Sequence, residues 1–179
     1  MRITILIVLL VTQCLVHAGT LTGRVVSVTD GDTIIVLDSG NAQHKVRLQG
    51  IDAPERGQAY GTKSKEHLSD SVAGRFVVVE YEKRDRYERI LGKVLLSGED
   101  MNLEQIRAGM AWHYKKYESE QTISDRVRYS DMEREARMEK RGLWLDPSPV
   151  PPWEYRQVKR QRMKELQHFM GKPEVRGSQ

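Results

Sequence analysis

The sequence contains a single cysteine, Cys14, among its 179 residues. One cysteine excludes an intramolecular disulfide framework and a cysteine-rich metal cluster. No apolar run reaches the roughly 20 residues that cross a bilayer, so the chain is not a polytopic membrane protein. Hydrophobic residues make up 39% and charged residues 30% of the chain, which excludes fibrous and wholly disordered proteins. The length suits one globular domain with a sizeable core, followed by a tail.

The first eighteen residues have the pattern of an export signal. Arg2 provides a short positive region, residues 3–11 are apolar, and Val16 and Ala18 occupy the small-residue positions of a cleavage site. An uncleaved membrane anchor is the alternative, but polar residues interrupt the apolar run before it could span. We therefore expect cleavage after Ala18, no membrane association afterwards, and a secreted or periplasmic protein. Cleavage also removes the only thiol, which suits an oxidising compartment.

Basic charge is concentrated at the C-terminal end of the chain. Residues 156–179 contain seven Lys or Arg and two Glu, whereas residues 19–155 carry a net charge of −2. A stiff, proline-rich linker at 147–152 precedes a segment, 153–170, with the composition of a basic helix. We expect this tail to help retain a polyanionic substrate. The alternative is that its apolar side chains pack it onto the domain as structure, namely Trp153, Leu166 and Phe169.

The spacing of apolar residues predicts strands first and helices later. Three strands are expected within residues 20–51, with Val26 and Val28 on one face of the first, and two more at 76–81 and 90–96. Helical spacing with terminal glycines predicts helices at 59–73, 102–108 and 124–140. This order is typical of an α+β, mainly β, protein: a five-stranded barrel of the oligonucleotide-binding (OB) type with three helices packed outside.

Four carboxylates occur at two expected strand ends, Asp30 and Asp32 at one, Asp52 and Glu55 at the other. A meander brings these ends together, and like charges held close need a cation or solvent between them. Oxygen ligands favour Ca²⁺ or Mg²⁺, and the five histidines lack the spacing of zinc ligands. Turn chemistry is enough to explain Asp30, whereas the other three together indicate a metal-dependent site.

Arginines near these carboxylates provide a second set of candidate site residues. Arg47 lies on the outward face of its strand, because Val46 and Leu48 share the other face. Residues 83–89 (KRDRYER) contain three arginines, of which Arg89 lies at a strand boundary, where its position is best defined. The forked donors of arginine match the oxygens of a phosphate group.

The segment 111–117 (AWHYKKY) contains aromatic side chains that are candidates for stacking on nucleic-acid bases. Trp112 and Tyr114 share one face if this segment is extended. Packing in the core explains Trp112 equally well, so both interpretations stay open at this point.

Five runs occur in a consistent order between residues 20 and 146: VTDGDT, VRLQGIDAPERGQAYG, DRYERILG, AGMAWHY and RGLW. Together they closely resemble the staphylococcal-nuclease-like (thermonuclease) family, whose members are five-stranded barrels with three helices that hydrolyse DNA and RNA with Ca²⁺. The resemblance implies an OB-fold domain at 19–146, which the signal peptide expected at 1–18 precedes and the linker and basic tail expected at 147–179 follow. It also implies a monomer with DNA or RNA as substrate and no stable protein partner.

Carried over position by position, the resemblance implies roles for nine residues. The ligands of one Ca²⁺ ion would be Asp32, Asp52 and the backbone carbonyl of Ala53. The catalytic residues would be Arg47, Glu55 and Arg89. The substrate contacts would be Tyr87, Trp112 and Tyr114. The implied reaction is endonucleolytic hydrolysis that leaves 3′-phosphate ends, in which Glu55 activates or positions water and the arginines stabilise charge on the phosphate oxygens.

Glu88 departs from the family pattern Asp-Arg-Tyr-Gly-Arg, where glycine stands at this position. Glycine permits a positive φ, which glutamate adopts at a cost, and Glu88 adds negative charge beside Arg89. Reduced activity or an altered substrate preference is therefore expected. A non-catalytic OB-fold module that binds nucleic acid is the alternative function, but such relatives lose the acidic and arginine positions kept here. A Ca²⁺-binding structural domain would explain the carboxylates but not Arg47 and Arg89.

Overall fold

The structure is a computed structural model that describes residues 19–170. The export signal expected at 1–18 and the last part of the tail, 171–179, lie outside the described residues. None of the described helices has both the length and the apolar character needed to cross a membrane.

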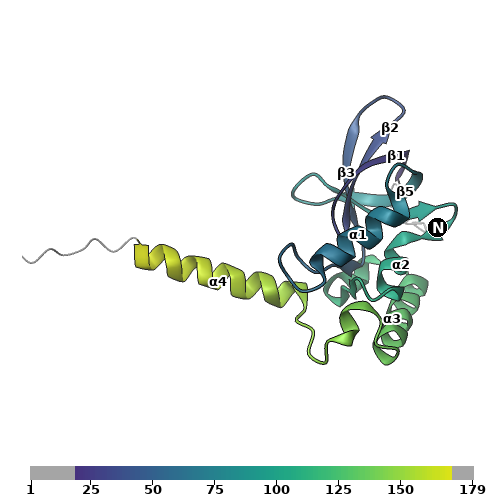
Figure 1. Cartoon of the computed structure of the whole chain (residues 1–179). Helices are drawn as coiled ribbons and strands as arrows, with labels where there is room; N and C mark the ends of the chain where they lie inside the picture. The colour runs from purple at the N-terminus through teal and green to yellow at the C-terminus, as the bar shows by residue number, and fades with distance from the viewer. Residues whose placement is uncertain (1–18, 171–179) are drawn as a thin grey trace, which may run out of the picture.

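Five strands close into a barrel (Figure 1). They are β1 (Gly19–Asp30), β2 (Thr33–Asp38), β3 (Gln43–Leu48), β5 (Phe76–Arg84) and β6 (Ile90–Leu96). β1, β2 and β3 form the expected antiparallel meander, β5 pairs with both β1 and β6, and β3 pairs in parallel with β6. The β3–β6 pairing returns the sheet onto itself, which confirms the five-stranded barrel predicted from the sequence.

Helices pack against the barrel at the three predicted places. These are α1 (Gly61–Val72), α2 (Met101–Arg107) and α3 (Ile123–Met138). Capping side chains fix where α2 and α3 begin: Asp100 accepts hydrogen bonds from two backbone N–H groups of α2, and Thr122 accepts one from Asp125. The short connecting elements are β4 (Ile51–Asp52), β7 (Glu99–Asp100), β8 (Trp112–His113) and two 3₁₀ helices, η1 (Lys115–Glu120) and η2 (Gly142–Leu145).

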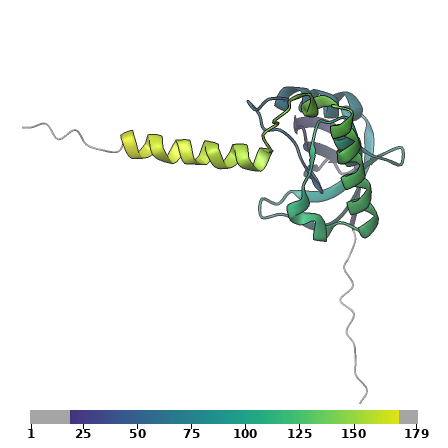
Figure 2. The ribbon, with the colours of Figure 1, turned by 90° about the horizontal axis from the view of Figure 1, so that it is seen from below.

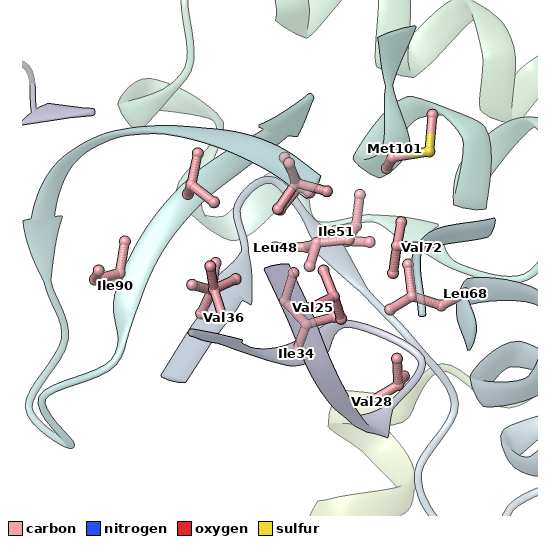
Figure 3. Close-up of a cluster of buried hydrophobic side chains, with 14 of the residues drawn as sticks. Val25, Val28, Ile34, Val36, Leu48, Ile51, Leu68, Val72, Ile90 and Met101 are labelled. Carbon is pink, nitrogen blue, oxygen red and sulfur yellow. The ribbon is translucent and has the colours of Figure 1, made fainter. Parts of the chain in front are cut away.

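Aliphatic side chains from the strands and helices fill the interior (Figure 3). Ile34, Val36 and Leu48 from the barrel meet Leu68 and Val72 from α1, and all five are almost fully buried. Each such side chain contributes about 1.5–3 kcal/mol when it leaves water. This shared core holds α1 against the barrel and fixes the strand ends from which the candidate site is built.

One expectation about the first strand is wrong. Val26 and Val28 were expected to share one face, but Val26 is 41% exposed, whereas Val25 and Val28 are buried. The register of β1 against β2 shifts between Val25 and Ser27, so the inward face changes by one residue at this irregularity. Strand alternation alone does not reveal such a shift.

The last described helix, α4 (Pro152–Met170), projects away from the barrel (Figures 1 and 2). It coincides with the basic helix expected at 153–170. Side chains from 157 to 169 are exposed, whereas those in its first turn are partly or fully buried, except Glu154. The first turn is therefore the part of α4 that contacts the body of the protein.

Asn102, in the first turn of α2, joins β6 to the residue that follows β3. Its Oδ1 accepts a hydrogen bond from Val94 N at 3.1 Å, and its Nδ2 donates to the carbonyls of Gln49 and Gly92 at 2.9 and 3.0 Å. The side chain is fully buried. Gly92 keeps a second donor, Gln49 N, so loss of the amide would leave two buried backbone groups without partners.

We predict that Asn102→Ala lowers the free energy of unfolding by about 3 kcal/mol, because each unsatisfied buried group costs about 1–3 kcal/mol. Urea denaturation measures this difference. The exposed Gln161→Ala serves as the control and should change stability by less than about 0.5 kcal/mol. A loss below about 1 kcal/mol for Asn102→Ala would mean that this junction does not depend on the amide.

Candidate active site

One broad cleft gathers the residues that the sequence singles out. It is bordered by the β1–β2 turn, the ends of β3 and β4, the β5–β6 loop, the segment after β8 and the first turns of α4. Eight of the nine predicted site residues line it: Asp32, Arg47, Ala53, Glu55, Tyr87, Arg89, Trp112 and Tyr114. The ninth, Asp52, is 0% exposed and meets the cleft through its hydrogen bonds to cleft-lining arginines.

Arg47 joins the two buried aspartates. Its Nη2 donates to Asp52 Oδ1 at 2.9 Å, and its Nη1 forms an ion pair with Asp32. The other oxygen of Asp32 accepts a hydrogen bond from Ala53 N at 2.8 Å. Burial lowers the pKa of Arg47, which the Asp52 carboxylate opposes, and an arginine side chain remains charged in proteins. The outward direction predicted for Arg47 therefore aims its guanidinium at the acidic strand ends.

Arg89 is held by Asp85, a residue to which the sequence analysis gave no role. Asp85 Oδ2 accepts a hydrogen bond from Arg89 Nε at 2.8 Å, and Oδ1 accepts from the backbone N–H groups of Tyr87 and Arg89. Burial alone would raise the pKa of Asp85, but the hydrogen bonds from Arg89 and Tyr87 outweigh it and lower this pKa. Asp85 lies two residues before Tyr87 and four before Arg89, whose backbone N–H groups it binds. An aspartate at this spacing is typical of a turn, so the sequence does contain a signal for these contacts.

The aromatic residues of the cleft have different environments. Trp112 is only 7% exposed and packs edge-on against Trp144 and Trp153, at centroid distances of 4.4 and 5.5 Å. Core packing therefore describes Trp112, even though it borders the cleft. Tyr114 stacks on Trp153, with centroids 5.5 Å apart and planes at 18°. Tyr87 is 63% exposed, with the Arg89 guanidinium 5.5 Å from its ring centroid.

Arg156 is a cleft residue that the sequence analysis assigned only to the basic tail. Its Nη1 donates to Glu55 Oε1 at 2.6 Å and to Asp52 Oδ1 at 3.1 Å, and its Nη2 donates to Asp52 Oδ2 at 2.7 Å. The hydrogen bond to Asp52, and then that to Glu55, raises the pKa of Arg156. Position 156 lies more than 100 residues from both carboxylates, so local sequence patterns carry no signal for this contact.

Two interpretations of the tail were open from the sequence, namely packing onto the domain and retention of a polyanionic substrate. Different parts of α4 are consistent with each. Trp153 packs on Tyr114 and Trp112, as the structural interpretation expects. Leu166 and Phe169 are 54% and 81% exposed, so for these two residues that interpretation is wrong. The first turn of α4 is thus part of the cleft, and the later turns present exposed basic side chains.

The donor set suits a hard divalent cation by its chemistry. Asp32 and Asp52 are buried carboxylates that share one guanidinium, and buried negative charge needs a positive partner. Arg47 and Arg156 occupy the oxygens of Asp52. Among residues 19–170, no three His, Cys, Asp or Glu side chains are close enough to hold a metal ion. The residues therefore fit Ca²⁺ in type, and a shared ion requires that guanidinium contacts to Asp52 open.

Comparisons with known proteins identify the family. A family profile described as staphylococcal nuclease homologue matches residues 45–146. The chain belongs to this family. An "uncharacterized endonuclease" of Escherichia coli is 44% identical to it over 160 residues, which is 89% of this chain and 100% of the relative. A "micrococcal nuclease" of Shigella flexneri is 38% identical over 145 residues, which is 76% of this chain and 80% of the relative.

A third relative is an "uncharacterized endonuclease" of Haemophilus influenzae, 40% identical over 142 residues, or 79% of this chain and 76% of the relative. The resemblance to the staphylococcal nuclease family seen in the sequence is confirmed by these matches. Within this family the barrel described above is the expected fold, and most cleft residues lie within the matched part of the chain. The exceptions are Asp30 and Asp32 at the β1–β2 turn, which precede the matched residues, and α4, which begins after them.

Glu88 bears out the conformation expected where the family pattern has glycine. Its φ is 60°, in the left-handed region that favours glycine. The turn is closed by Asp85 O, which accepts from Glu88 N at 3.0 Å, and by Arg84 Nη1, which donates to Glu88 O at 2.9 Å. This backbone conformation costs about 1–2 kcal/mol in a residue with a side chain. The turn that positions Arg89 in this member of the staphylococcal nuclease family is therefore strained.

We predict that Asp85→Asn destabilises the protein by about 1.5–3 kcal/mol at pH 7, the range for a hydrogen bond to a charged group. The pKa of Asp85 is lowered in the folded state. Its carboxylate therefore contributes stability above the unfolded pKa of about 3.9, and this contribution is lost as pH falls through the lower folded pKa. The stability difference between wild type and variant should shrink below about pH 4, as measured by thermal unfolding between pH 2.5 and 7.

The control is Asp70→Asn, which changes an exposed carboxylate on α1. Its effect should stay below about 0.5 kcal/mol at every pH. An Asp85→Asn effect that does not depend on pH would show that the charge of Asp85 does not hold the turn.

Proposed function

We propose that the protein is an exported, Ca²⁺-dependent endonuclease that hydrolyses phosphodiester bonds of DNA, and of RNA as a second substrate class. The observation that carries this proposal is one cleft in which Glu55, Arg47 and Arg89 gather around two buried aspartates. Membership of the staphylococcal nuclease family, with relatives named as nucleases, supports the same activity. Nucleic acid is then the substrate, and the protein acts as a monomer without a stable protein partner.

The two arginines are suited to stabilise the negative charge that develops on the phosphate oxygens. Each guanidinium is already oriented by a carboxylate, Arg47 by Asp52 and Arg89 by Asp85. They are near enough to each other that the charge of Arg89 contributes to lowering the pKa of Arg47. Donors fixed before the reaction need no reorganisation during it, which is how such sites lower a barrier. Both arginines are therefore placed to contact one phosphate group.

Glu55 is the group suited to take a proton from the attacking water. Its carboxylate is partly exposed in the cleft, with one oxygen bonded to Arg156. The water oxygen bonds to phosphorus as the P–O5′ bond breaks, the proton of that water passes to Glu55, and the 5′ oxygen leaves as it takes a proton from solvent. Asp32, Asp52 and the carbonyl of Ala53 would hold Ca²⁺, which supplies positive charge beside the phosphoryl oxygens.

Export is the part of the proposal that rests on the sequence alone. The positive, apolar and small-residue order of residues 1–18 supports a cleaved signal and a secreted or periplasmic enzyme. A non-catalytic nucleic-acid-binding module is the competing function. The retained Glu55 beside Arg47 and Arg89 favours the enzyme, because binding alone needs no carboxylate directed at a polyanion.

We predict that Glu55→Gln lowers kcat at least about 100-fold, because the amide cannot accept the proton. Plasmid nicking in the presence of Ca²⁺ measures the rate. The matched control is Glu66→Gln, which changes an exposed carboxylate of α1 that does not line the cleft, and it should retain wild-type kcat. Chelation with EDTA and EGTA should abolish nicking by the wild type, and Ca²⁺ should restore it better than Mg²⁺. Full cleavage in chelator would overturn the metal-dependent mechanism.

The exposed cations of α4 give a separate prediction about substrate retention. We predict that neutralising three of them lowers the slope of log K against log salt by up to about 3, because each lost contact to duplex DNA removes about 0.9. The three are Lys159, Arg162 and Lys164. Binding is measured from 50 to 200 mM salt in the Glu55→Gln background, and kcat with the native Glu55 should not change.

The matched control neutralises three exposed cations outside α4, namely Arg24, Lys65 and Arg75. Equal changes in slope for both triple variants would mean that general charge, not α4, retains the substrate. An unchanged slope for the α4 variant would mean that these cations do not contact the substrate and that the tail has only a structural role.

A further inference from the structure

The first turn of α4 places a positive charge on the proposed catalytic carboxylates. Arg156 bonds to both oxygens of Asp52 and to Glu55, with nitrogen–oxygen distances from 2.6 to 3.1 Å. Asp52 is 0% exposed, so Arg156 is one of two cations that compensate its buried charge, and Arg47 is the other. A buried carboxylate in this setting is stable only with such partners.

Arg156 and a divalent cation compete for the same oxygens. Ca²⁺ binds carboxylate oxygen at about 2.3–2.6 Å, while the guanidinium of Arg156 occupies both oxygens of Asp52. Charge balance points the same way. Arg47 and Arg156 together contact three carboxylates, those of Asp32, Asp52 and Glu55. Among these directly bonded groups, Ca²⁺ in place of Arg156 balances the three negative charges, whereas Ca²⁺ added beside Arg156 gives a net positive charge.

The segment that carries Arg156 is attached to the body by a small set of contacts. Trp153 stacks on Tyr114, and the carbonyl of Val150 accepts a hydrogen bond from Gln58 Nε2 at 2.6 Å. Beyond Arg156 the side chains of α4 are exposed through residue 169. Release of Arg156 therefore disturbs the contacts of Trp153 with Tyr114 and Trp112 and a few polar contacts, not the core of the barrel. The same movement would expose the face of Tyr114 that Trp153 now covers.

We propose that Arg156 is a displaceable internal counter-ion, and that the first turn of α4 is an autoinhibitory latch. In the closed state Arg156 neutralises Asp52 and holds Glu55; Ca²⁺ opens the latch by taking its place. The latch thus sets the Ca²⁺ concentration at which the carboxylates and the aromatic face become available to nucleic acid. This inference rests on the proposed function, because it assigns Asp52 to the Ca²⁺ site.

Calcium binding in the absence of nucleic acid tests the latch directly. The full chain and its Arg156→Gln variant are titrated with Ca²⁺ by calorimetry, and the melting temperature is recorded at each concentration. If the closed state holds about 90% of the molecules, apparent affinity is reduced about tenfold, so Arg156→Gln should bind Ca²⁺ about tenfold more tightly. Without metal the variant should melt at a lower temperature than wild type, and the gap should close at saturating Ca²⁺.

The matched control is Arg162→Gln, which removes the same charge from an exposed site on the same helix. Its Ca²⁺ affinity should equal that of wild type. Equal affinities for wild type and Arg156→Gln would overturn the latch and leave the nuclease proposal intact. Weaker DNA binding by Arg156→Gln with unchanged Ca²⁺ affinity would also overturn it, and would assign Arg156 to the substrate. Absence of Ca²⁺ binding in all three proteins, with no Ca²⁺-stimulated nicking, would reject the proposed function as well.

Discussion

Two buried aspartates at neighbouring strand ends are the constraint around which the cleft is organised. Asp52 is 0% exposed and Asp32 4%, and neither can keep its charge there without positive partners. Arg47 serves both, which fixes its guanidinium at the barrel surface. The remaining oxygen of Asp52 needs a further cation, and in the structure this is Arg156. The acidic pair therefore determines where arginines, and a divalent ion, bind.

Barrel closure is what brings Arg89 near Arg47, the arginine that serves the acidic pair. The parallel pairing of β3 with β6 places Arg47 opposite Leu91 and Val46 opposite Ile90. Arg89 lies directly before β6, two residues ahead of Leu91, so the same register brings it near Arg47 although the two arginines are 42 positions apart in the sequence. A shift of one residue in this pairing would turn Leu91 and its neighbours to the opposite face. The core that fixes the register thus also fixes the distance between Arg47 and Arg89.

Features that depend on local pattern could be predicted from the sequence, and those that depend on distant contacts could not. Alternation placed Arg47 outside the core, and the expected positive φ at Glu88 follows from a known turn position. The register shift between Val25 and Ser27 is not visible in the alternation of apolar and polar residues. Asp85 lies in the run KRDRYER at residues 83–89, but only the geometry of the turn shows that it holds Arg89. Arg156 meets Asp52 only because the chain folds back after α3, a contact that composition cannot indicate.

The residues of α4 form two groups, one that lines the cleft and one that does not. Trp153, Arg156, Gln157 and Arg160 line the cleft and follow the i, i+3, i+4, i+7 spacing of a single helical face. Lys159, Arg162 and Lys164 do not line the cleft. An electrostatic contribution to nucleic acid binding can come from the second group while the first group acts on the carboxylates. Because both groups are on one continuous helix, opening of the latch would also move the exposed cations, so Ca²⁺ binding and substrate retention would be linked through α4.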